Sequence, residues 1–143
     1  MENEVKEPAV KYNYISPGEY LVAERIATEK HAYFNGEVVV ISGASKEHNS
    51  IAKNFSMLVL PFLKGKNCAI FGSDLRVHIP EKSLYTYPDF TTIYGEWETV
   101  DSKKDTVMNP SLIVEILSKS TWDYNRGKKL TFTEVVKPSK YIS

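Results

Sequence analysis

Two acidic residues in strand-like surroundings are the side chains of this sequence best suited to chemistry. Glu115 lies inside the apolar run of residues 112–117. Such a run predicts a central strand that is covered on both faces. A buried carboxylate there is costly unless it is paired, protonated or bound to a cation. Asp89, at the start of the strand-like segment 87–94, is the best candidate to meet it. Two carboxylates on neighbouring strands predict a site for a hard divalent cation, Mg²⁺ or Mn²⁺.

A cation held by this pair would suit the hydrolysis of a phosphodiester bond. Bound through Asp89 and Glu115, it can activate a water molecule and neutralise the charge that develops on the leaving oxygen. A lysine nearby can position the attacking water or stabilise the transition state. Leu117 stands two residues after Glu115 on the same strand face, so the ammonium must come from elsewhere. Lys129, on the helix expected next, is the natural donor, and Lys128 is the less favoured neighbour.

Each of these residues also has an ordinary structural explanation. Asp89 follows a proline and can cap a turn. Glu115 can form a structural ion pair with Arg76 or Lys129, and Lys129 alone can be a solvated surface charge. His48 falls on an apolar helix face, where a histidine is more often part of the core than a catalyst.

Two further acids are weaker candidates for the same site. Glu37 comes just after a predicted hairpin turn and can be a surface residue of a strand. Asp74 is expected on the same strand face as Arg76, so these two residues can pair with each other.

Local patterns in the first half of the chain predict the elements that position these residues. Residues 16–19 form a capping box with proline at the first helical position, which predicts a short helix. Asn35-Gly36 between two β-prone runs predicts a hairpin over residues 31–41. Ser45 is expected to cap a helix that ends near Gly65. The apolar face predicted for that helix consists of Ile51, Phe55, Leu58, Val59 and Phe62.

The second half of the chain is predicted to consist mainly of strands. Three strands are expected, over residues 69–79, 87–94 and 112–117. Residues 80–86 and 96–105 are expected to form loops between them, and a final helix carries Lys129. The order of helices and strands predicts an α+β (mixed α/β) fold.

Composition limits the organisation and the partners of the protein. A chain of 143 residues with 42% hydrophobic residues predicts one domain, residues 14–143, after a flexible arm of residues 1–13. Lys and Arg number 18, as do Asp and Glu, so DNA binding needs a local basic patch or a second subunit. The single Cys68 and the absence of a signal-peptide core or a transmembrane-length apolar run predict a cytoplasmic protein without a membrane contact.

A series of short motifs resembles the Uma2 family of endonucleases, also classified as DUF820. The matching stretches cover about residues 16–130 in the order of the family. They are Tyr20-Leu21, Glu24-Arg25, Gly36-Glu37-Val38, Ser42-Gly43-Ala44-Ser45, His48-Asn49, Ser73-Asp74-Leu75-Arg76-Val77, Tyr87-Pro88-Asp89, Asn109-Pro110-Ser111-Leu112, Glu115-Ile116-Leu117-Ser118-Lys119-Ser120-Thr121 and residues 123–129. The resemblance implies a restriction-endonuclease-like core, in which helices flank a central mixed β-sheet. It also implies an N-terminal helix, a β-hairpin and a site of the PD-(D/E)xK kind.

The resemblance also implies roles for individual residues. Asp89 looks like the aspartate of the motif and Glu115 like its second acid, both as metal ligands. Lys129, near the start of the following helix, takes the place of the displaced lysine. The implied activity is the Mg²⁺- or Mn²⁺-dependent hydrolysis of DNA. The supporting residues that the resemblance implies are Glu37, His48 and Asp74.

One departure from the family concerns the end of the chain. The family normally continues past the lysine helix into a further strand and helix, so residues 14–143 are expected to form a domain shortened at its C-terminus. An open sheet edge would then favour a homodimer. The neutral charge and the short C-terminus leave open an inert module that keeps the nuclease fold for binding or assembly. A hydrolase of another phosphate ester at the same metal site is a third possibility.

Overall fold

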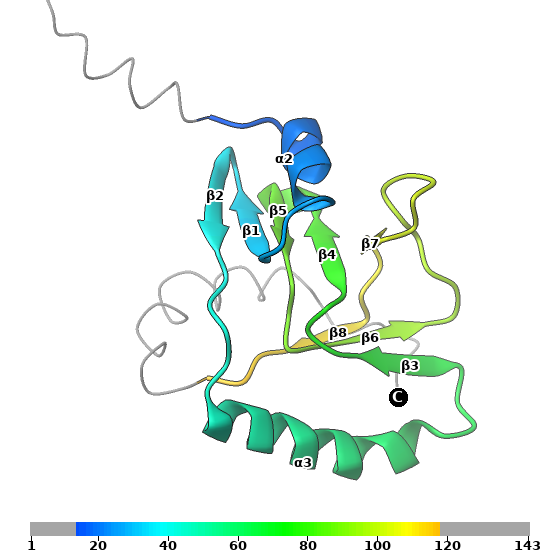
Figure 1. Cartoon of the computed structure of the whole chain (residues 1–143). Coiled ribbons are helices and arrows are strands. Elements are labelled where there is room, and N and C mark those ends of the chain that lie inside the picture. Colours follow the sequence, from blue (N-terminus) through cyan, green and yellow to red (C-terminus); the bar gives the residue numbers. More distant parts are fainter. Residues whose placement is uncertain (1–13, 118–143) are drawn as a thin grey trace, which may run out of the picture.

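The computed structural model describes residues 14–117 of the chain (Figure 1). The helices and strands in this part are α2 (Pro17–Glu24), β1 (His31–Phe34), β2 (Glu37–Val40), α3 (Lys46–Leu63), β3 (Cys68–Phe71), β4 (Arg76–Ile79), the short 3₁₀ helix η1 (Pro80–Lys82), β5 (Leu84–Thr86), β6 (Phe90–Tyr94), β7 (Thr106–Val107) and β8 (Leu112–Val114). The α+β class predicted from the sequence is confirmed.

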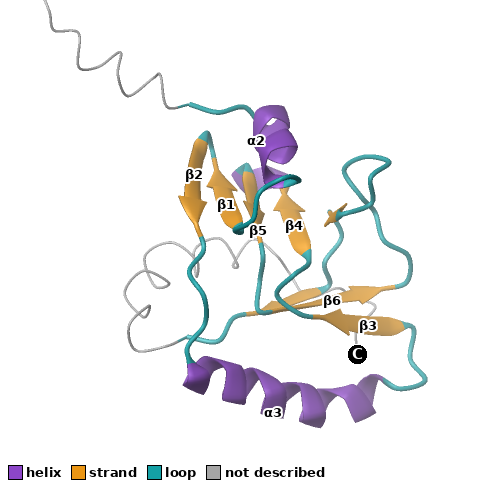
Figure 2. Cartoon of the chain, in the orientation of Figure 1, coloured by secondary structure: helices purple, strands orange, loops and turns teal. Residues whose placement is uncertain are grey.

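The strands form two sheets that share no strand. The larger sheet has five strands in the order β2-β1-β5-β4-β7, and the smaller has three in the order β3-β6-β8. Strands β4 and β7 run parallel and the other pairs run antiparallel, so the strand arrangement is mixed. Figure 2 shows α3 running along the three-stranded sheet, whereas α2 lies beside the five-stranded sheet.

The elements predicted for residues 16–45 are confirmed. The Ser16 Oγ accepts a hydrogen bond from the Glu19 N–H at 3.1 Å, and a Glu19 carboxylate oxygen accepts one from the Ser16 N–H at 2.9 Å. The hairpin turns at Asn35 and Gly36, which have φ angles of 47° and 98°. Ser45 caps α3 by accepting a hydrogen bond from the His48 N–H at 3.0 Å.

Helix α3 covers the three-stranded sheet with a different face from the one predicted. Its half-buried residues include Phe55 and Val59, and the Phe55 ring lies 4.9 Å from that of Phe90 on β6. The predicted Ile51, Leu58 and Phe62 are exposed by 50%, 71% and 74%. These three residues project from a flank of the helix, because at about 100° per residue they lie roughly a quarter turn from the half-buried face.

Two predictions for the middle of the chain are wrong. The single strand expected over residues 69–79 is divided between β3 and β4, which belong to different sheets. The turn-forming segment 72–74 separates them, because Gly, Ser and Asp favour turns over extended structure. The loop expected over residues 80–86 contains β5, which lies between β1 and β4 in the larger sheet.

The strand predicted over residues 112–117 is present but shorter and less central. Strand β8 covers only Leu112–Val114 and pairs with β6 alone among the described residues. Its side chains are exposed or half-buried, and Leu112 is 38% exposed. The final helix predicted to carry Lys129 lies outside the described residues.

Two groups of buried side chains form the core of the described part. One joins strands of both sheets and consists of Val77, Ile79, Leu84, Ile93 and Val107. The other joins α2 to the larger sheet and consists of Tyr20, Leu21, Tyr33 and Tyr85. Neither helix in residues 14–117 has the length and apolar character needed to span a membrane.

Candidate functional site

The antiparallel register of β6 and β8 sets where the two candidate acids lie. Phe90 and Val114 form the last pair of the two strands, and Asp89 and Glu115 are the residues just beyond that pair. The Asp89 Oδ2 accepts a hydrogen bond from the backbone N–H of Ile116 at 2.6 Å. Asp89 is therefore joined directly to the segment that carries Glu115, across 27 positions of sequence.

The polar segment before β8 fixes this register. The Ser111 N–H donates to the Thr92 carbonyl at 2.7 Å, and the Ser111 Oγ accepts from the Tyr94 N–H at 3.1 Å. Asn109 donates to the Glu96 carbonyl and accepts from the Glu98 N–H, each at 2.8 Å. A slip of one residue would break these bonds, so they fix the pairing of β8 with β6 next to Asp89.

His48, in the first turn of α3, contacts the other oxygen of the same carboxylate. Its Nε2 lies 3.0 Å from the Asp89 Oδ1. The two side chains are only 18% and 16% exposed, so solvent screens this contact weakly. The structure thus brings together His48, Asp89 and the backbone beside Glu115.

The remaining candidates from the sequence lie elsewhere. Glu37 is the exposed first residue of β2, in the other sheet. Asp74 is in the turn between β3 and β4, with a side chain that is 99% exposed and lies 2.9 Å from the Lys30 Nζ. Lys129 lies outside the described residues. Asp74 and Arg76 do not form the pair that the sequence suggested, because Arg76 is buried and pairs with Asp105.

Within residues 14–117, no three side chains of His, Cys, Asp or Glu come together in a way that could hold a metal ion. Carboxylate oxygens, such as those of Asp89, suit Mg²⁺ and Mn²⁺ better than softer cations. Mg²⁺ is commonly bound through only one or two carboxylates, with water and substrate phosphate as its other ligands. A carboxylate such as that of Asp89 is therefore of a type that can bind a hard cation together with water and substrate.

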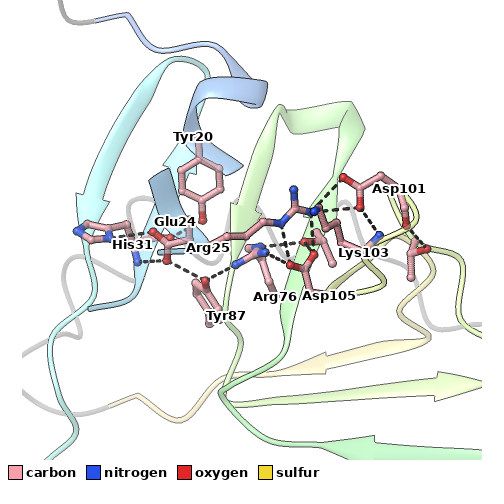
Figure 3. Close-up of polar contacts among 11 residues, drawn as sticks. Tyr20, Glu24, Arg25, His31, Arg76, Tyr87, Asp101, Lys103 and Asp105 are labelled. Carbon is pink, nitrogen blue, oxygen red and sulfur yellow. Dashed lines mark hydrogen bonds and ion pairs between the residues drawn. The ribbon is translucent and has the colours of Figure 1, made fainter. Parts of the chain in front are cut away.

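A second polar group, which the sequence analysis missed, connects α2 to the five-stranded sheet (Figure 3). Glu24, buried at the end of α2, accepts hydrogen bonds from the His31 N–H at 2.7 Å and from the Tyr87 hydroxyl at 2.8 Å. The Tyr87 hydroxyl accepts in turn from the Arg76 guanidinium at 2.8 Å. Burial raises the pKa of Tyr87 to about 12, so its hydroxyl keeps its proton at neutral pH.

The same group continues to the loop of residues 101–105. Asp105 forms ion pairs with Arg76 at 3.0 Å and with Arg25 at 2.8 Å, and Arg25 also contacts Asp101 at 3.1 Å. The hydrogen bonds from Arg25 hold the pKa of the Asp105 carboxyl well below its ordinary value. Because arginines neutralise these carboxylates, the group is suited to stabilising the fold and poorly suited to holding a cation.

One signal in the sequence points to this group. Arg76 stands between Leu75 and Val77, and charged residues are almost never fully buried unless they are paired. The sequence does not show which acid pairs with it, because the two partners lie 29 positions apart.

The fold is shared with a solved nuclease-type structure. A crystal structure of a putative nuclease belonging to DUF820 from Anabaena variabilis superimposes with a TM-score of 0.68. The match covers 87% of this chain and 70% of that chain at 16% sequence identity. The protein is therefore an α+β protein with the fold of that structure.

Sequence comparison defines the family more closely. The family model of Uma2, described as "Putative restriction endonuclease", matches residues 17–132. Two uncharacterized proteins of Synechocystis sp. are 37% and 38% identical over 122 residues, which is 85% of this chain in each case. The chain spans 69% of the first relative and 63% of the second. The chain belongs to the Uma2 family.

Membership of a family described as a putative restriction endonuclease supports a nuclease function and contact with nucleic acid, and proteins of this kind generally use divalent metal ions. The comparisons do not support the homodimer expected from the sequence.

Proposed function

We propose that this protein is an endonuclease that hydrolyses DNA phosphodiester bonds with Mg²⁺ or Mn²⁺. Asp89 and Glu115 are the metal ligands in this proposal, and Lys129 is the charge-stabilising group. The observation that supports it best is the 2.6 Å hydrogen bond from the Ile116 N–H to the Asp89 Oδ2, which joins Asp89 to the residue next to Glu115.

The chemistry follows from the types of these side chains. Each Asp89 oxygen has two lone pairs and one described contact, so each keeps an electron pair for a cation. The bound cation would supply a polarised phosphate and an activated water molecule. The Lys129 ammonium would stabilise the charge that develops on the phosphoryl oxygens.

Cleavage of supercoiled plasmid DNA tests the proposal. Wild-type protein with Mg²⁺ or Mn²⁺ is expected to nick the plasmid, and chelation by EDTA is expected to stop the reaction. Asp89→Asn, Glu115→Gln and Lys129→Met should each reduce the rate by about 100-fold or more, because each removes part of the charge stabilisation.

Glu81→Gln is the matched control, because Glu81 lies on η1 with an exposed side chain. It should cut like wild type. Equal cutting by wild type and Asp89→Asn would contradict the assigned site, and cutting that persists in EDTA would contradict the metal dependence.

A catalytically inert module with the same fold is the alternative. It is favoured by the net charge of zero, which gives the chain no overall attraction for the DNA backbone. Calorimetric titration with Mn²⁺ separates the two functions: the inert module gives no binding heat that depends on Asp89 and Glu115.

A further inference from the structure

The Asp89 carboxylate is held by groups from two elements that are distant in sequence. The Ile116 N–H, just after β8, contacts one carboxylate oxygen at 2.6 Å. The His48 Nε2, on α3, contacts the other at 3.0 Å. A carboxylate with both oxygens engaged can neither rotate about its own axis nor change rotamer without losing a contact.

His48 has a feature that packing alone does not explain. Its Nδ1 is buried and has no hydrogen-bond partner among the described residues. Leaving a buried polar atom without a partner costs about 1–3 kcal/mol, and such atoms are uncommon in folded proteins. His48 is half-buried on α3, a helix that has no fully buried side chain in the described structure. The distinguishing contact of His48 is the one with Asp89.

We propose that His48 is a positioning residue, which orients the Asp89 carboxylate from helix α3 so that Asp89 and Glu115 can bind the same cation. This inference rests on the function proposed above. Residues that hydrogen-bond to a metal-binding side chain without touching the metal typically contribute about 10–100-fold to metal affinity or activity. His48 would not touch the substrate or the cation and would act only through Asp89.

Calorimetric titration of the full chain with Mn²⁺ is the first test. His48→Ala is expected to bind Mn²⁺ about 10–100-fold more weakly than wild type. His48→Gln should recover part of this loss, because its amide keeps an N–H donor that can reach a carboxylate oxygen. Asn54→Ala is the control, since Asn54 is an exposed residue of the same helix. Circular dichroism shows whether each variant keeps the helix.

The backbone amide of Ile116 supplies a second readout that requires no metal. In ¹H–¹⁵N spectra of the metal-free protein, His48→Ala should shift the Ile116 amide in the same direction as Asp89→Asn. A change in the orientation of Asp89 alters the 2.6 Å hydrogen bond that this amide donates. Asn54→Ala should leave the resonance unchanged.

The outcomes separate this role from the proposed function. Wild-type affinity in His48→Ala, or an unshifted Ile116 amide in that variant, would overturn the role of His48 and leave the metal site in place. Equal losses in His48→Ala and His48→Gln would also overturn it, because a donor to Asp89 would not then be what matters. Failure of the wild type to bind Mn²⁺ would remove the proposed function, and the role of His48 with it.

Discussion

Acidic residues beside the two sheets of this protein have different kinds of partner. Beside the five-stranded sheet, Asp105 pairs with two arginines and the buried Glu24 accepts hydrogen bonds from Tyr87 and His31. At the three-stranded sheet, the described contacts of Asp89 are a backbone N–H and an imidazole. A carboxylate that faces an arginine has its charge neutralised, whereas one held by weaker donors keeps charge available for a cation.

Side chains are also more deeply buried between α2 and the larger sheet than on α3, which covers the smaller sheet. Next to the larger sheet, the rings of Tyr20, Tyr33 and Tyr85 lie within 5.2–5.7 Å of one another. The Tyr20 hydroxyl donates to the His31 carbonyl at 2.6 Å, and the Tyr33 hydroxyl donates to the Ile15 carbonyl at 2.7 Å. Helix α3, which covers the smaller sheet, has no fully buried side chain in the described structure.

This contrast suggests that the two regions have different roles. The larger sheet and its buried polar group would supply most of the stability, and the smaller sheet would present the site. Tyr87 joins the two regions, because its hydroxyl belongs to the buried group and it lies two residues before Asp89. The following predictions test this contrast.

Arg76→Met is expected to have the largest effect on stability. The substitution removes the hydrogen bonds of the buried guanidinium to Tyr87 and Thr106 and its ion pair with Asp105, which should lower the free energy of unfolding by about 3 kcal/mol. Urea unfolding measures the loss. Lys64→Met, a similar change at an exposed position near the end of α3, should alter the free energy of unfolding by less than about 0.5 kcal/mol. A loss below about 1 kcal/mol for Arg76→Met would contradict the assigned stabilising role.

Tyr87→Phe should destabilise the protein by about 2 kcal/mol, because it leaves the buried Glu24 and Arg76 each short of one hydrogen bond. Tyr85→Phe keeps its ring in the aromatic cluster and loses a hydroxyl that takes no part in this group, so its effect should be smaller. Thermal unfolding of both variants under the same conditions makes the comparison. Equal losses would show that the hydroxyl of Tyr87 has no special role.

Asp105→Asn is expected to lower the free energy of unfolding by about 1 kcal/mol at neutral pH. The loss is smaller than for a fully buried carboxylate because the side chain of Asp105 is 37% exposed and solvent screens its ion pairs. The cost should depend on pH. Since the pKa of Asp105 is lowered in the folded protein, its contribution is complete above the ordinary pKa of about 4 and is lost as the pH falls below that value.

Unfolding curves between about pH 7 and pH 2 should therefore show wild type approaching Asp105→Asn in stability as the solution becomes acidic. A constant difference across this range would contradict the role of the ionised carboxylate.

Leu58→Gln should have the smallest effect, less than about 0.5 kcal/mol, because Leu58 is 71% exposed on α3. Such a result would show that an exposed apolar side chain on α3 contributes less to the free energy of unfolding than the buried hydroxyl of Tyr87 does. Urea unfolding gives the value. A loss above about 1 kcal/mol would contradict this prediction and indicate that Leu58 is buried in solution.

Several features of the fold could be predicted from the sequence because their causes are local. The capping box at Ser16, the Asn35-Gly36 turn and the Ser45 cap each depend on residues within about four positions of one another. The division of residues 69–79 between two sheets depends on pairing with β6 and β5. Local propensity gives no information about such distant partners.

The sequence by itself determined the residue types of the candidate site: an aspartate before β6, a glutamate after β8 and a histidine in the first turn of a helix. Only the tertiary structure decided that His48 and the Ile116 N–H meet the same carboxylate, and that Arg76 pairs with Asp105 rather than with Asp74. The reason is physical. A side chain's chemistry is carried by its own atoms, but its partners depend on strand register and helix packing, which many distant residues set together.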